Sequence, residues 1–113
     1  LNPTTTLIVG KNNKQNDFVT FKLGKANDLW FHVKNIPGSH VILKTTLPEP
    51  EEKDILQAAS VAAAFSKAKN SSKVPVDYTR KRFVKKPNGA KPGFVIYTDQ
   101  QTLYVTPSLP EKN

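Results

Sequence analysis

One segment of the sequence has helical periodicity, and it lies between two regions of β-prone runs. In residues 48–70 the apolar side chains form a broad face that includes six alanines between Ala58 and Ala68. Such a small-residue face lets a helix lie close to a sheet. Pro48 fits the first turn of a helix, and the acids that follow it complement the positive helix N-terminus. The segment therefore predicts one Ala-rich helix that ends near Asn70.

The runs on either side of this helix supply a sheet. They are residues 6–9, 17–23, 28–34, 39–44, 74–86, 94–98 and 102–106. The polar Gly- and Asn-rich residues 10–16 predict a hairpin tip, and Pro37-Gly38 predicts a tight turn. We expect an α+β fold with a mainly antiparallel sheet that this single helix covers on one face. Residues 1–113 are predicted to form one domain.

The register of the hairpin over residues 28–44 decides where two histidines lie. If Phe31 shares a core face with Val41, as the apolar pattern favours, then His32 and His40 lie together on the other face. We predict this register, with the second face polar. Trp30 also lies on the second face, and we interpret it as a core residue because tryptophans are usually well buried.

Positive charge is concentrated in one part of the chain. Between Lys67 and Lys91 there are nine basic residues and one acid, a net charge of +8 that equals the net charge of the whole chain. Such a field attracts polyanions, because each neutralised phosphate releases counterions. Nucleic acid is therefore the first candidate partner.

The predicted nucleic-acid-binding residues combine this cluster with lysines of the first hairpin tip and with residues on the polar face of the second hairpin. They are Lys11, Lys14, His32, Lys34, His40, Arg80, Lys81, Arg82, Lys85, Lys86 and Lys91. Arg80 and Arg82 are expected to project from the same side of one long strand. For Lys11 and Lys14 an equal alternative is open, because exposed hairpin tips often carry lysines that serve only solubility. For the histidines, hydrogen bonding inside the domain and contact with phosphate or ribose remain equal alternatives.

Several chemistries are disfavoured by the residues. The chain has no cysteine, and no carboxylate lies beside the two histidines as a third ligand, so we expect no metal and no cofactor. Ser39 and His40 are neighbours on a strand and point to opposite faces, so no catalytic residue is predicted. No run approaches the roughly 18 apolar residues of a spanning helix, so we expect no membrane insertion. The start at Leu1 suggests a domain cut from a longer soluble protein.

Several motifs together resemble the NFACT-R domain. The most specific are DLWFHVK at residues 28–34 and PGSHV at residues 37–41. The others are residues 10–12, 15–17, 64–66, 76–79, 85–90 and 92–93, in the order expected for the family. The resemblance covers nearly the whole chain.

This resemblance implies a non-enzymatic RNA-binding module of the ribosome-quality-control proteins. Such factors bind obstructed large ribosomal subunits and tRNA and support template-free tailing of the stalled nascent chain. The implied partners are tRNA and large-subunit rRNA, in the cytoplasm, and we expect the family's N-terminal domain and coiled coil to lie outside this sequence. The family is also named fibronectin-binding protein A-like in Gram-positive bacteria, which implies an alternative: a fibronectin-binding adhesion module at the cell surface. A third class, a metal- or Ser-dependent enzyme, needs a convergent pocket that the sequence does not supply.

Overall fold

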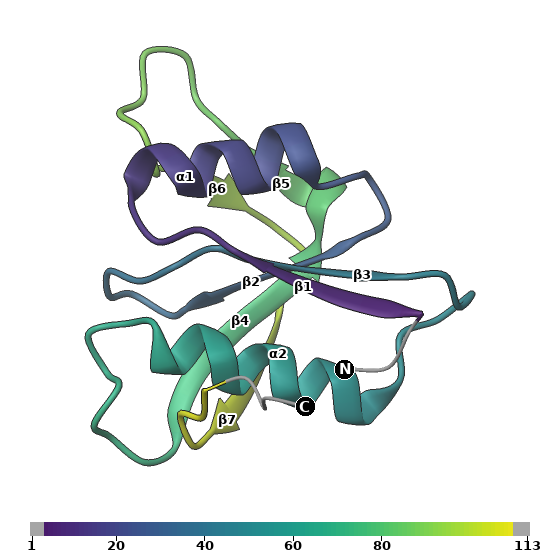
Figure 1. Ribbon diagram of the computed structural model, residues 1–113. Coiled ribbons are helices and arrows are strands. Elements are labelled where there is room, and N and C mark those ends of the chain that lie inside the picture. The colour runs from purple at the N-terminus through teal and green to yellow at the C-terminus, as the bar shows by residue number, and fades with distance from the viewer. Residues whose placement is uncertain (1–3, 110–113) are drawn as a thin grey trace.

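A computed structural model of the chain describes residues 4–109 and confirms the α+β fold with an antiparallel sheet. Five strands form this sheet in the order β1-β3-β2-β4-β7. They are β1 (Thr5–Val9), β2 (Leu29–Val33), β3 (Val41–Thr45), β4 (Val74–Arg80) and β7 (Gln101–Val105). Figure 1 shows the sheet between two layers, with α2 on one side and α1, β5 and β6 on the other.

The Ala-rich helix, α2 (Glu52–Ala64), covers one face of the sheet as predicted. Its buried alanines pack in one core cluster with apolar side chains of β2, β3 and β4. The prediction that the helix continues to about Asn70 is wrong, because α2 ends at Ala64. The Ser66 hydroxyl donates to the carbonyl of Ala63 (2.7 Å) and accepts from the N–H of Ala68 (3.0 Å). These bonds replace the next helical turn.

The other face of the sheet is covered by a helical segment that the sequence analysis missed. Residues 13–23 form α1 (Asn13–Phe18) and the π-helical η1 (Val19–Leu23), where a hairpin tip and a strand were predicted. The Asn12 side chain accepts the N–H of Gln15, and the Gln15 side chain accepts the N–H of Lys11. This reciprocal cap starts a helix, and packing against the sheet overrides the alternating pattern of residues 17–23.

The predicted long strand over residues 74–86 is interrupted. Strand β4 ends at Arg80, and the 3₁₀ turn η2 (Lys81–Phe83) leads into β5 (Val84–Lys85). Strand β5 pairs with β6 (Ile96–Tyr97), whereas β7 pairs with β4, so the two closing strands have different partners. Because η2 breaks the strand, Arg80 and Arg82 do not project from one strand as predicted.

The predicted register of β2 and β3 is confirmed, and it gives the domain two cores. Phe31 and Val41 pack in the core beneath α2. Trp30 and Ile42 pack in a second core with Val19 and other residues of the opposite layer, and Trp30 is 0% exposed. The interpretation of Trp30 as a core residue is confirmed, but the face expected to be polar is a second apolar core. Among residues 4–109, no helix is both long and apolar enough to cross a bilayer.

Candidate nucleic-acid interface

The layer opposite α2 carries most of the basic residues that the structure groups together. We define the basic layer as residues 13–23 and 81–97, which comprise α1, η1, η2, β5, β6 and the turn between the last two strands. These residues include seven basic side chains and one acid, a net charge of +6. The α2 side has no such excess, because residues 48–73 include four acids and four lysines. The basic layer and the charge-balanced segment that contains α2 lie on opposite sides of the sheet, whose layers Figure 1 shows.

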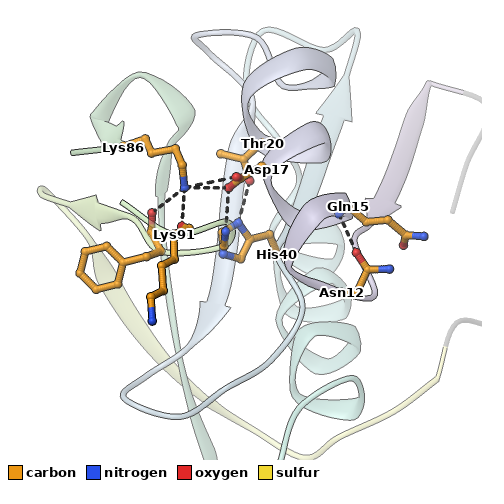
Figure 2. Close-up of polar contacts among 9 residues, drawn as sticks. Asn12, Gln15, Asp17, Thr20, His40, Lys86 and Lys91 are labelled. Carbon is orange, nitrogen blue, oxygen red and sulfur yellow. Dashed lines mark hydrogen bonds and ion pairs between the residues drawn. The ribbon is translucent and has the colours of Figure 1, made fainter. Parts of the chain in front are cut away.

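An ion pair clamps the turn of the basic layer onto α1 (Figure 2). Nζ of Lys86 lies 3.2 Å from a carboxylate oxygen of Asp17 and donates to the carbonyls of Lys91 (2.7 Å) and Phe94 (3.2 Å). The other carboxylate oxygen of Asp17 accepts the N–H of Gly93 (3.0 Å). An ammonium group has three N–H donors, and here they face protein acceptors. Lys86 therefore holds the turn in place, and its direct contact with RNA stays a prediction.

A chain of hydrogen bonds beneath the basic layer holds His40 in the interior, and Figure 2 shows the bond between Thr20 and His40. The indole N–H of Trp30 donates to the Thr20 hydroxyl (3.2 Å), and that hydroxyl lies 2.8 Å from Nδ1 of His40. An indole nitrogen only donates, so the Thr20 hydroxyl accepts from Trp30; it donates to Nδ1 of His40 in the neutral tautomer that carries its proton on Nε2. Burial, and secondarily His32, lower the pKa of His40 to about 3.

His40 is therefore a structural residue. It is 2% exposed and uncharged near neutral pH, so it offers no charge to a phosphate, and its contact with nucleic acid stays a prediction. Of the two alternatives left open for this residue, the structure supports hydrogen bonding inside the domain. Its main-chain N–H also donates to the Asn16 side chain (3.0 Å), which ties β3 to α1.

His32 lies on the same face as His40, as predicted, but it is only partly buried. Its ring stacks on Trp30, with the ring centroids 5.9 Å apart and the planes 15° from parallel, and it meets the ring of His40 edge-on at 5.4 Å. Burial lowers the pKa of His32, while Asp77 acts in the opposite direction. A neutral imidazole is a poor phosphate contact and a good hydrogen-bonding group for ribose or base.

The buried carboxylate of Asp77 organises the residues next to His32. It accepts hydrogen bonds from the hydroxyls of Tyr97 (2.7 Å) and Thr102 (2.6 Å), and Nζ of Lys34 lies 3.6 Å away. Burial, and then the hydrogen bond to Asp77, raise the pKa of Tyr97, so its hydroxyl stays a donor. The charge of Lys34, a predicted contact, is partly balanced by this ion pair.

The two arginines predicted as contacts converge on Asn27. Arg80 donates to the carbonyl of Asn27 (2.6 Å) and to Glu49 (2.9 Å), which holds it at the end of the sheet. Arg82 donates to the Asn27 side chain, and its guanidinium lies 5.0 Å from the ring centroid of Phe83. Arg82 is exposed and Arg80 is partly buried. A flat guanidinium with unused donors suits phosphate, so Arg82 is the better placed of the two.

The remaining predicted lysines divide into covered and exposed side chains. Lys81 is partly buried over the ring of Phe21, at 5.5 Å from its centroid. Lys11 is exposed, precedes α1, and its Nζ lies 5.2 Å from the ring centroid of Phe65. The exposed cations of the predicted set that lie within the basic layer are Lys14, Arg82, Lys85 and Lys91.

The structure adds side chains that the sequence analysis did not select. Phe18 (54% exposed) and Lys22 lie with Lys14 at four-residue spacing along α1 and η1, and all three are exposed. Phe94 of the clamped turn is also exposed. Exposed aromatic rings among lysines are typical of surfaces that bind single-stranded nucleic acid. The predicted strand over residues 17–23 hid this pattern, and the signal that would have revealed it is the cap formed by Asn12 and Gln15.

The described residues contain no arrangement for metal chemistry. Within residues 4–109, no group of three or more His, Asp or Glu side chains is placed to hold a metal ion. What the fold presents instead is a small α+β scaffold with a clamped basic layer on one side. Fold and surface together define the class of small basic binding modules.

Comparison with known proteins gives the family. The family described as "NFACT protein RNA binding domain" matches residues 2–99. The chain belongs to this family, which confirms the resemblance seen in its motifs.

Two curated relatives carry the same name. The chain is 58% identical over 102 residues to the Rqc2 homolog RqcH of Bacillus subtilis (strain 168), which covers 90% of this chain and 18% of that protein. It is also 51% identical over 104 residues to the Rqc2 homolog RqcH of Streptococcus suis (strain 05ZYH33). That match covers 92% of this chain and 19% of the relative. The chain thus spans about a fifth of the length of these relatives.

A solved structure has the same fold. It is titled as the C-terminal part of the fibronectin/fibrinogen-binding protein from Streptococcus suis. The two chains are 51% identical, with a TM-score of 0.87 over 92% of this chain and 41% of the other.

Proposed function

We propose that the domain is a non-enzymatic RNA-binding module of a cytoplasmic ribosome-quality-control factor, and that it engages tRNA and the rRNA of the large subunit. Membership of an RNA-binding domain family and similarity to proteins named Rqc2 homolog RqcH support this role. The observation that carries the proposal is the concentration of charge, with a +6 basic layer on one side of the sheet and a charge-balanced segment on the other. A polyanion approaching the domain is drawn most strongly to the basic layer.

The proposed contact is with the phosphate backbone. Lys14, Lys22, Arg82, Lys85 and Lys91 are exposed and supply the charge. Neutralising phosphates with such residues releases counterions and supplies affinity that does not depend on sequence. The partly buried cations of the layer are proposed to hold its segments in place, because protein groups already contact their charged ends.

A salt titration with labelled tRNA tests the proposal. If several lysines meet phosphates, log K falls linearly with log salt, with a slope of about −0.7 to −0.9 per contact. We expect Lys85→Glu with Lys91→Glu to weaken binding and to reduce this slope by about two contacts. The matched control is Lys53→Glu with Lys69→Glu, which changes the net charge equally at exposed positions outside the basic layer. Equal effects of the two pairs would contradict a located interface.

The second candidate is an adhesion module that binds fibronectin at the cell surface. The similarity to a protein titled fibronectin/fibrinogen-binding favours it. Fibronectin in the same assay separates the two functions. Binding of fibronectin without tRNA binding would reverse the order of the proposals.

A further inference from the structure

A cavity of about 390 Å³ lies where the turn of the basic layer meets the turn between β2 and β3. Its walls include His32, Asn35 and Pro37 from the sheet side and Phe94 and Tyr97 from the basic layer. This volume falls within the range of about 300–1,000 Å³ that is typical of small-ligand sites. None of these five residues is used by the phosphate contacts proposed above.

We propose that this cavity binds one unstacked nucleobase of single-stranded RNA. The inference rests on the proposed RNA-binding function and adds a base-binding site to a surface otherwise argued from charge alone. The occupant is identified by the chemistry of the walls, which combine flat apolar groups with neutral polar groups.

The apolar walls suit a flat ring. Phe94 is 56% exposed beside the cavity, and Pro37 is exposed opposite it. An exposed aromatic ring beside a cavity offers a flat face on which a base can stack. Bases that are splayed out of a single strand stack on such rings, and every base has a face that allows it.

The polar wall suits the edge of a base better than a phosphate. The imidazole of His32 is neutral near pH 7 because burial lowers its pKa, so it has one donor and one acceptor. The Asn35 amide also offers both kinds of group. A phosphate needs donors and positive charge, whereas a base edge presents donors and acceptors together.

The walls are fixed before a ligand arrives. Lys86 holds the carbonyl of Phe94, and Asp17 holds the N–H of Gly93, which also lines the cavity. His40 forms part of the floor and is held by Thr20. Preorganised walls reduce the ordering cost of binding. The exposed Lys91 precedes this wall by three residues and is placed to meet the phosphate of the inserted nucleotide.

The test compares two single-stranded RNA oligomers of the same length, one of uridines and one fully abasic. The phosphates are the same, so only a base-binding site distinguishes them. We expect the uridine oligomer to bind about tenfold or more tightly than the abasic one, the size of a single stacking contact. Phe94→Ala should remove this difference. Tyr104→Ala, which truncates an aromatic that is 70% exposed on β7 and does not line the cavity, should preserve it.

A second readout locates the base. A 2-aminopurine placed within the oligomer should lose fluorescence on binding to the wild-type domain and retain it with Phe94→Ala. Asn35→Gly is a further variant, because Asn35 has φ of 62° and glycine accepts that conformation while removing the amide. We expect this variant to bind the uridine oligomer several-fold more weakly and to bind the abasic oligomer as tightly as the wild type does.

The outcomes separate this inference from the proposed function. Equal, salt-dependent binding of the two oligomers would overturn the base site and leave the phosphate contacts intact. Binding of neither oligomer nor tRNA would overturn the proposed RNA-binding function itself. A base preference that survives Phe94→Ala in a folded protein would also overturn the assignment to this cavity.

Discussion

The ammonium nitrogen of Lys86 lies 3.2 Å from the carboxylate of Asp17, a residue 69 positions earlier in the chain. This pair joins α1 to the turn that follows β5, and through it the Gly93 N–H and the Phe94 carbonyl are fixed as well. A lysine that the charge pattern marks as a ligand contact is thus part of the scaffold. Its neighbour Lys85 is exposed and has no such partner among the hydrogen bonds and ion pairs found within residues 4–109.

Exchanging each lysine for methionine should separate these two roles. Lys86→Met removes a partly buried ion pair and two hydrogen bonds to carbonyls, and we expect unfolding free energy to fall by about 1–3 kcal/mol. Lys85→Met should change it by less than about 0.5 kcal/mol and should weaken tRNA binding. Urea denaturation and a binding titration measure both effects. A Lys86→Met protein as stable as the wild type would contradict the clamp.

Replacing Thr20 by valine should destabilise the domain while conserving shape. The substitution leaves the Trp30 indole N–H and Nδ1 of His40 buried without their shared partner. We expect a loss of about 1–3 kcal/mol in unfolding free energy, the cost of unsatisfied buried polar groups. Thr6→Val, at an exposed position of β1, is the control and should be nearly neutral. Equal stabilities of the two variants would show that the relay contributes nothing.

The stability of the domain should depend on pH through His40. Its pKa is about 3 in the folded protein and about 6.5 when unfolded, so between these values the unfolded chain binds more protons. The stability that depends on keeping His40 neutral is therefore fully present above about pH 6.5 and is lost as the pH falls toward 3. This group changes the free energy of unfolding by at most about 1.4 kcal/mol per pH unit. Urea midpoints at pH 7, 6 and 5 follow the effect. In His40→Gln the slope should be smaller, and an unchanged slope would assign the pH dependence to other groups.

Local patterns predicted the central part of the fold. The alternation of Phe31 and Val33 against Trp30 and His32 sets the register of β2 on β3, because only one register buries the first pair beneath α2. The same argument placed the two histidines on one face. The register and the common face of the histidines both follow from the alternation of adjacent residues, so they can be predicted from one sequence.

The rest of the site depends on contacts between distant segments. Residues 17–23 alternate like a strand, and only a cap at Asn12 together with packing over Trp30 makes them helical. Without that layer, the second face of the sheet was expected to be polar, and His40 was interpreted as accessible. The inward direction of Lys86 depends on Asp17, so no local pattern could distinguish it from Lys85.

Mapping amide chemical shifts during a titration with tRNA would show whether RNA binds to the basic layer. If it does, the largest shift changes fall on residues 13–23 and 81–97, near Lys14, Lys22, Lys85 and Lys91, while the amide shifts of α2 do not change. The largest shifts on α2 or on β7, with the basic layer unchanged, would contradict binding to the basic layer.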